Sequence, residues 1–267
     1  PPGRKQPMPQ PIKQVLTIAG SDSGGGAGIQ ADLKAMSANG VFAMSVITAV
    51  TAQNTEEVTD VFELPLSIIA SQLDAVFDDF EVAAVKTGML ASAALVRQVA
   101  DAIRGYGWTR LVVDPVMVAT SGDRLLEPDA EAVIREALLP LAAVVTPNLG
   151  EAAILAQMEV RDEASMEAAG HRILALGARA VLVKGGHLPG NVLVDILVTS
   201  EGTRRFSHPR VATTSTHGTG CTLSAAITAG LALGHPLDQA VPTALEYVHR
   251  ALLAAPGLGG GHGPLNH

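Results

Sequence analysis

Short apolar segments alternate with longer segments of helical periodicity along most of the chain. Residues 111–113 (Leu-Val-Val) and 181–183 (Val-Leu-Val) are apolar without interruption, which is typical of strands buried on both faces of a parallel sheet. The alternation predicts an α/β fold with a mostly parallel central sheet and helices on both faces. Strands are predicted at 15–19, 41–50, 82–86, 111–114, 143–146 and 180–184, and helices at 27–39, 66–77, 91–104, 130–138, 163–176, 219–233 and 237–253.

A segment before the last two predicted helices and the two ends of the chain depart from this pattern. Residues 192–199 and 204–208 are expected to form an antiparallel pair at one edge of the sheet. The sequence contains no linker and no internal repeat, so we predict a flexible N-terminal arm over residues 1–14 and a single domain over residues 15–267. The Gly-rich tail, residues 257–267, is predicted to be irregular.

Composition argues against several classes of partner. Of the 267 residues, 48% are hydrophobic and 16% are charged, so the chain is expected to be globular. A net charge of −8 and only 3% aromatic residues argue against nucleic acid, but not against a small phosphorylated ligand. We expect no membrane segment, because no apolar stretch is long and uninterrupted. The single cysteine excludes an intrachain disulfide and is compatible with a reducing cytoplasm.

Glycines and polar side chains gather where six of the predicted strands end. Ligands of open parallel sheets bind beyond the carboxyl ends of the strands. We therefore expect these residues to meet at one rim and form one composite site. The six groups are Gly20-Ser21-Asp22, Gln53-Asn54, Lys86-Thr87-Gly88-Met89, Asp114-Pro115-Val116-Met117, Thr146-Pro147-Asn148 and Lys184-Gly185-Gly186-His187.

A glycine turn, Gly218-Thr219-Gly220, directly precedes Cys221 and an apolar helical run. Free N–H groups and the positive end of the helix dipole make such a turn an anion site. The same environment is expected to lower the pKa of the Cys221 thiol and to favour the reactive thiolate. The alternative is a loop that only caps a buried helix, with Cys221 as a small apolar filler.

Phosphate binding, if it occurs, cannot use the common nucleotide loops. The sequence lacks G-x-x-x-x-G-K-[ST], and residues 24–28 fail G-x-G-x-x-G because Ile29 occupies the last glycine position. The turn before Cys221 and the cation of Lys184 are the remaining candidates, although Lys184 is also explained as a solvated lysine.

Two acidic positions have two interpretations each. Asn148 and Glu151 lie three residues apart at a strand-to-helix junction, where they would either hold Mg²⁺ or cap the helix. Asp114 precedes a proline and is either a turn former or a metal-binding or basic carboxylate.

Seven segments, taken together and in order, resemble hydroxymethylpyrimidine/phosphomethylpyrimidine kinases, which are thiamine-biosynthesis enzymes of the ribokinase superfamily. The similarity runs from about Val15 to His267, and the ending, residues 261–267, also resembles that of the family. The segments are VLTIAGSDSGGGAGIQAD (15–32), TAVTAQNT (48–55), KTGML (86–90), DPVM (114–117), TPNLGE (146–151), VKGGH (183–187) and THGTGCTLSAA (216–226).

The resemblance implies a fold and a reaction. The fold is a ribokinase-like three-layer α/β/α sandwich with antiparallel edge strands. The reaction uses ATP and Mg²⁺ to phosphorylate 4-amino-5-hydroxymethyl-2-methylpyrimidine to its monophosphate and then to the diphosphate. The resemblance also implies a homodimer.

The resemblance assigns the pyrimidine to one group of residues. Gln53 would hydrogen-bond the aminopyrimidine, because a carboxamide offers both a donor and an acceptor. Gly20 would contact the ring through its backbone, with Asp22 nearby. Met89 and Val116 would pack on the ring faces.

The resemblance assigns phosphate and metal to a second group. Gly218, Thr219 and Gly220 would bind the transferring phosphoryl group, and Cys221 stands where sugar kinases usually have a basic aspartate. Cys221 either takes the proton of the attacking hydroxyl or shapes the pocket, and we expect it to matter more for the first phosphorylation than for the second. The remaining roles are phosphate or ATP binding by Lys184, Gly185 and Asn148, and Mg²⁺ binding by Glu151 and Asp114.

Two alternatives compete with this interpretation. A pyridoxal or pyridoxine kinase would use the same fold and the same phosphate-binding residues. A catalytically silent metabolite-binding protein would be expected to lack those residues, which are all present. A mobile lid is predicted over residues 119–125, around Ser121-Gly122-Asp123.

Overall fold

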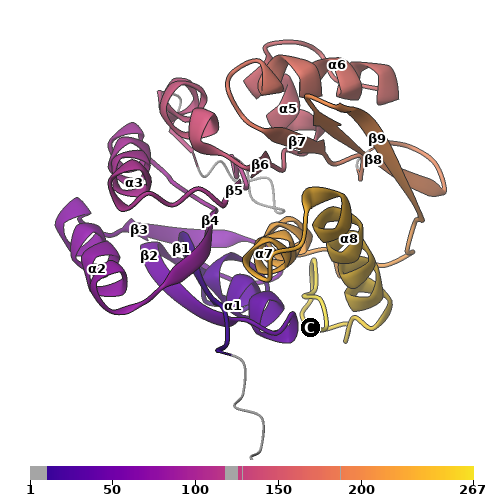
Figure 1. Cartoon of the computed structure of the whole chain (residues 1–267). Helices are drawn as coiled ribbons and strands as arrows, with labels where there is room; N and C mark the ends of the chain where they lie inside the picture. The colour runs from indigo at the N-terminus through magenta and orange to yellow at the C-terminus, as the bar shows by residue number, and fades with distance from the viewer. Residues whose placement is uncertain (1–10, 118–125, 128, 187) are drawn as a thin grey trace, which may run out of the picture.

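One sheet organises the molecule (Figure 1). The computed structural model describes residues 11–117, 126–127, 129–186 and 188–267. Within them the strand order is β3-β2-β1-β4-β5-β6-β7-β8-β9, and neighbours are parallel from β2 to β7 and antiparallel at both edges. The strands are β1 (Gln14–Asp22), β2 (Phe42–Gln53), β3 (Val58–Glu63), β4 (Val82–Thr87), β5 (Leu111–Val113), β6 (Val144–Val145), β7 (Ala180–Val183), β8 (Val192–Thr199) and β9 (Gly202–Pro209).

Helices cover both faces of the sheet, which gives the predicted three layers. Side chains of a strand alternate between faces, and β5 shows the result. Leu111 and Val113 pack in the cluster that includes α2, α3, α5 and α6, while Val112 packs against α7 and α8. The helical segments are α1 (Gly28–Ala38), α2 (Leu66–Asp79), α3 (Ala93–Tyr106), α4 (Ala130–Val133), η1 (Ile134–Leu138), η2 (Leu139–Leu141), α5 (Leu149–Ala156), α6 (Glu163–Leu174), α7 (Thr219–Ala232) and α8 (Leu237–Leu253).

Each predicted strand and helix is present, and the antiparallel pair β8–β9 is confirmed. The additional elements are β3 and the short helix η2, and α5 was expected only through its cap at Asn148 and Glu151. The helix predicted over 130–138 begins as α4 and widens into a π-helical turn, η1. The tail, 257–267, has no helix or strand, but His217 and Pro264 form a β-bridge that ties it to the domain.

Two predictions concern segments that are wholly or largely outside the described residues. The predicted lid, 119–125, lies entirely outside them, and so does most of the predicted arm, 1–14. Gln14, assigned to the arm, is the first residue of β1. Among the described residues, no helix combines the length and the apolar character needed to cross a bilayer.

Candidate active site

A pocket of about 850 Å³ lies at the carboxyl ends of the parallel strands, where α7 begins. The predicted composite rim is thereby observed, because groups that follow six strands line a single hollow. The predicted site residues that line it are Gly20, Asp22, Gln53, Met89, Asp114, Val116, Asn148, Glu151, Lys184, Gly218, Thr219, Gly220 and Cys221.

Gly185 is the one predicted site residue that does not line the pocket. Its amide donates to the Asp195 carboxylate at 2.9 Å, and a Cβ at this position would lie 2.0 Å from the carbonyl oxygen of Val194. Gly185 therefore packs against β8, and its neighbour Gly186 faces the pocket instead.

The glycine turn is held at the N-terminus of α7. Gly218 has φ of +82° and is the N-cap residue, a left-handed conformation that glycine adopts without strain. A Cβ at Gly218 would lie 1.8 Å from the carbonyl oxygen of Gly26, so only glycine allows this approach. The Thr219 hydroxyl donates to the Thr216 carbonyl at 3.1 Å and braces the turn. The start of α7 thus presents a rigid, electropositive backbone to the pocket.

Lys184 and Asp114 form the charged centre of the pocket. The Lys184 ammonium lies 3.3 Å from Asp114 Oδ1, and the exposed fractions of the two side chains are 16% and 2%. Hydroxyl groups of Ser224 and Thr146 donate to the same carboxylate at 3.2 and 3.3 Å. Burial alone would lower the pKa of Lys184, but attraction to Asp114 and Glu151 outweighs it and raises that pKa. Lys184 is therefore a permanent cation at neutral pH.

Asn148 and Glu151 form the helix cap that the sequence allowed. The Asn148 side chain accepts from the Glu151 amide at 2.9 Å, and Glu151 Oε2 accepts from the Asn148 amide at 2.8 Å. Glu151 nevertheless lines the pocket and is 5% exposed. Burial raises its pKa to about 7, with Asp114 adding to the shift and Lys184 opposing it.

The thiol of Cys221 differs from the prediction. Burial raises its pKa to about 11, although nearby Lys86 favours the thiolate. The expectation of a lowered pKa was wrong, because the cost of burying the thiolate exceeds the help from the helix terminus and from Lys86. Cys221 is therefore a neutral thiol at pH 7.

The residues predicted to bind the ring also line the pocket. A Cβ on Gly20 would lie 2.6 Å from the terminal methyl of Met89, so a larger residue at position 20 would collide with the Met89 side chain. The Thr48 hydroxyl anchors Met89 by donating to its carbonyl at 2.9 Å. Thr51 lies 3.1 Å from Gln53 Oε1 and donates to it. The Gly20 backbone, the Met89 thioether and the Gln53 carboxamide therefore line the same pocket.

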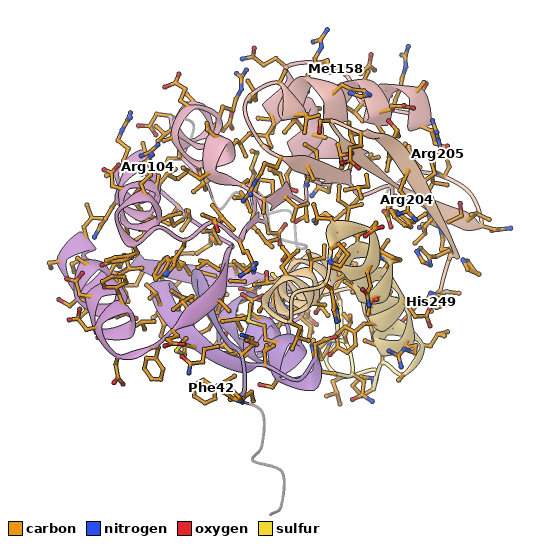
Figure 2. The ribbon with its side chains drawn as sticks, in the orientation of Figure 1. Phe42, Arg104, Met158, Arg204, Arg205 and His249 are labelled. Atoms are coloured by element: carbon orange, nitrogen blue, oxygen red, sulfur yellow. The ribbon has the colours of Figure 1, made fainter. Side chains whose placement is uncertain are left out.

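Sequence reasoning missed several groups of the site. His217 and Lys86 stand inside the quoted motifs but received no role, since their partners Asp22 and Asp32 lie 195 and 54 residues away. His249, which lies on α8 (Figure 2), also lines the pocket, and its ring is 6.1 Å from that of His208 on β9. An apolar wall from α7 and α8 completes the lining: Leu223, Leu245, Val248 and Leu252.

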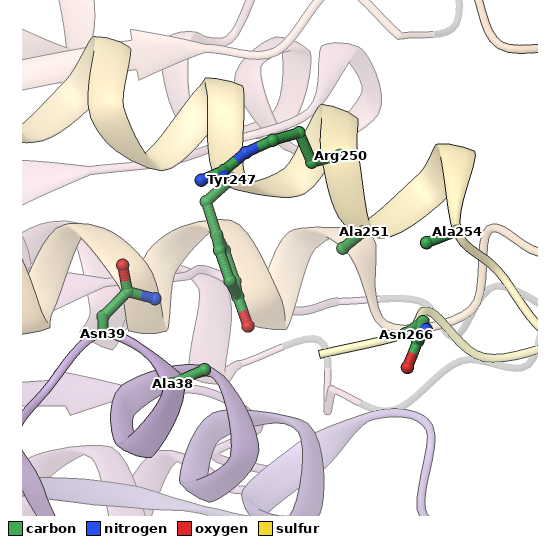
Figure 3. Close-up of a pocket in the computed structure, with 7 residues that line it drawn as sticks. All are labelled: Ala38, Asn39, Tyr247, Arg250, Ala251, Ala254 and Asn266. Carbon is green, nitrogen blue, oxygen red and sulfur yellow. The ribbon is translucent and has the colours of Figure 1, made fainter.

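A second, smaller hollow of about 340 Å³ lies between the ends of α1 and α8 (Figure 3). Its polar lining consists of Asn39, Tyr247, Arg250 and Asn266, with three alanines. None of the predicted site residues is among them, so the larger pocket is the candidate active site.

Comparisons with known proteins identify the family of the chain. A family model described as phosphomethylpyrimidine kinase matches residues 22–266. A hydroxymethylpyrimidine/phosphomethylpyrimidine kinase from Rhizobium meliloti is 54% identical over 256 residues, which cover 95% of this chain and 96% of that protein.

Two solved structures are similar over nearly the whole chain. A pyridoxal kinase from Bacillus subtilis, solved as an ADP complex, has a TM-score of 0.90 at 38% identity and covers 96% of this chain and 97% of its own. A phosphomethylpyrimidine kinase from Clostridium difficile has a TM-score of 0.81 at 44% identity, covering 90% and 99%. The ordered motifs, the sheet topology and the 54% identity over 95% of the chain lead to one conclusion: the chain belongs to the phosphomethylpyrimidine kinase family.

Proposed function

We propose that the chain is an ATP-dependent kinase of thiamine biosynthesis. It phosphorylates 4-amino-5-hydroxymethyl-2-methylpyrimidine to the monophosphate and then the monophosphate to the diphosphate. One observation carries the proposal. A single pocket joins the ring-binding wall of Gly20, Gln53 and Met89 to the glycine turn and the cation of Lys184. Ring and phosphate can therefore be bound side by side, as direct transfer requires.

Phosphoryl transfer depends mainly on positioning and on electrostatic stabilisation. The backbone of Gly218-Thr219-Gly220 would stabilise negative charge on the transferring group, and Lys184, whose ammonium lies beside Gly220, would neutralise the phosphate. The apolar wall of α7 and α8 would hold the nucleotide. In the second step the acceptor is already a phosphate and needs no base.

Glu151 and Asp114 suit a magnesium ion. They are close enough that the Asp114 charge raises the pKa of Glu151, and Mg²⁺ prefers one or two carboxylates together with substrate phosphates. Among the described residues no group of three or more His, Cys, Asp or Glu is arranged to hold a metal alone, which accords with a site that the phosphates complete. When bound, Mg²⁺ would offset the charge of the phosphate groups.

The test is product analysis by anion-exchange chromatography after incubation with the pyrimidine and MgATP. The proposal expects a monophosphate that is then converted to the diphosphate. Lys184→Met should abolish both steps, and exposed Lys13→Met is the matched control. ATP hydrolysis without any phosphorylated pyrimidine would contradict the proposal.

A pyridoxal kinase is the second candidate, and one observation favours it. The TM-score with the Bacillus subtilis pyridoxal kinase, 0.90, exceeds the 0.81 obtained with the Clostridium difficile pyrimidine kinase. The same assay with pyridoxal decides between the two. A higher kcat/KM for pyridoxal than for the pyrimidine would identify the chain as a pyridoxal kinase.

We also propose a homodimer in the cytoplasm. The β2–β3 edge supports the dimer, because the paired residues Val50 and Phe62 share one face of the sheet and are 46% and 65% exposed. Light scattering coupled to size exclusion should report twice the chain mass, and Phe62→Asp should report a monomer. The free Cys221 in an ATP-dependent site supports the location of the protein in a reducing compartment. Cell fractionation tests this location.

A further inference from the structure

We propose that Asp22 and His217 are a positioning pair that locks the phosphoryl-binding turn to the ring-binding end of the pocket. The inference rests on the proposed function for its kinetic consequence only. Neither residue is placed on the reacting atoms, and both act through the backbone that they hold.

The carboxylate of Asp22 accepts four hydrogen bonds. Oδ1 accepts from the Gly24 amide at 2.7 Å, and Oδ2 accepts from the amides of Gly26 and Ala27 at 3.0 and 2.8 Å. Oδ2 also lies 2.8 Å from Nε2 of His217. Burial raises the pKa of Asp22, but the bonds from His217 and the amides lower it more. Because this carboxylate is ionised, His217 is the donor in the pair.

The two loops that the pair joins are also in backbone contact. A Cβ on Gly26 would lie 2.5 Å from the His217 ring, and a Cβ on Gly218 would lie 1.8 Å from the Gly26 carbonyl oxygen. The glycine loop (residues 22–28) therefore forms the support on which the turn (residues 216–220) rests. A shift of the His217 ring has to move one of them.

A segment of the tail connects the same turn to the ring-binding loop. The His217 amide donates to the Gly263 carbonyl at 3.1 Å, and the Thr216 hydroxyl lies 3.2 Å from Nδ1 of His262. The His262 amide in turn donates to the Thr55 carbonyl at 2.7 Å. Residues 261–263 therefore bridge the turn and the loop after Gln53.

The glycine loop reaches the ring-binding end directly as well. The Ser23 hydroxyl donates to the backbone carbonyl of Gln53 at 2.6 Å. The backbone N–H of Gln53 donates to the same hydroxyl at 2.8 Å. Asp22 is adjacent in the chain to Ser23. The distance from the pyrimidine to the phosphoryl group is thus fixed through Ser23, Asp22 and His217.

The kinetic test compares His217→Ala with His217→Gln, whose amide can replace the Nε2 donor. We expect Ala to lower kcat by about 10- to 100-fold, because a small displacement of the turn misaligns transfer. The KM for the pyrimidine should change by less than about threefold, because the substitution leaves in place the contacts that hold the pyrimidine equally in the ground state and the transition state. Gln should recover most of kcat, and exposed His171→Ala should match the wild type.

Hydrogen exchange measured by mass spectrometry gives a readout that needs no activity. His217→Ala should speed exchange in peptides covering 22–28 and 216–222 together, and leave 66–79 in α2 unchanged. If the wild type phosphorylates no pyrimidine, the proposed function fails while this result still decides the pair.

Three outcomes would overturn the inference. A raised KM with unchanged kcat would make His217 a substrate ligand. Equal losses in His217→Ala and His217→Gln would remove the role of the hydrogen bond. Faster exchange in 216–222 alone would show that the loops are independent. Should His217→Ala fail to fold, His217→Gln is compared with the wild type alone. A kcat and exchange rates close to those of the wild type are then expected, and a large loss of kcat in a folded His217→Gln would overturn the inference.

Discussion

The ammonium group of Lys86 lies 2.8 Å from each carboxylate oxygen of Asp32, and neither side chain is exposed to solvent. The Thr17 hydroxyl donates to the same carboxylate at 2.6 Å. Burial would lower the pKa of Lys86, but Asp32 outweighs it and raises that pKa, so the lysine stays charged. The pair joins β4 to α1 beneath the pocket, which Lys86 also lines.

Removing Lys86 alone should lower the free energy of unfolding more than removing Lys86 and Asp32 together. Lys86→Met should lower the free energy of unfolding by about 3–5 kcal/mol, because Asp32 is left buried and uncompensated. Lys86→Met combined with Asp32→Leu should restore part of that loss. Urea titration measures both, and Arg250→Ala, at an exposed pair, should change stability by less than about 0.5 kcal/mol. A double variant less stable than Lys86→Met would contradict this account.

Alkylation of the only cysteine reports the state of its thiol. With a pKa of about 11, Cys221 should react with iodoacetamide at a rate that rises steadily from about pH 7 to about pH 10. Mass spectrometry gives the rate, and Cys221→Ser is the blank. A plateau near neutral pH would show a thiolate and overturn the assignment of a neutral thiol.

Replacement of Cys221 should separate the two phosphorylations. The first acceptor is a hydroxyl that loses a proton, while the second is already an anion. Only the minor thiolate form of Cys221, whose pKa is about 11, can accept that proton. Cys221→Ala should therefore reduce kcat for the pyrimidine more than kcat for its monophosphate, and Cys221→Asp should recover the first step preferentially. Initial rates with each acceptor measure this. Equal losses in the two steps would refute a role in proton transfer.

Glu151 should make the protein less stable as the pH rises. Its pKa is 4.5 when unfolded and about 7 when folded, so the folded state binds the extra proton. This contribution is full below about pH 4.5 and is lost by about pH 7, a change of about 3 kcal/mol. Urea titrations across this window should show the fall in the wild type and not in Glu151→Gln. Parallel curves would contradict the raised pKa.

The layers of the fold followed from sequence because they depend on local patterns. Helix α8 has the predicted limits, and the apolar strand β7 was placed within a residue. Strand β3 was missed because Val58–Glu63 carries Asp60 and Glu63 on an exposed edge, where no apolar alternation is required. The start of helix α5 was indicated by its cap at Asn148 and Glu151, but its extent was not predicted, because the helix is short and has Gly150 in its first turn.

The site was predictable in membership but not in energetics. Motif order identified the lining, whereas the pKa of Cys221 depends on burial that no neighbour in sequence reveals. Gly185 was assigned with its motif, yet the close approach of Val194 turns it away from the pocket. The bond from His217 to Asp22 spans 195 residues, so only the folded chain shows it.

The most direct test of the account is a crystal structure with the pyrimidine and a non-hydrolysable ATP analogue bound together. The account predicts that the ring contacts Gln53 and Met89 and that the γ-phosphate contacts the backbone of Gly218–Gly220 and the Lys184 ammonium. The hydroxymethyl oxygen should lie in line with the γ-phosphorus, at about 3–3.5 Å. A γ-phosphate bound away from the glycine turn, or a pyrimidine bound outside this pocket, would contradict it.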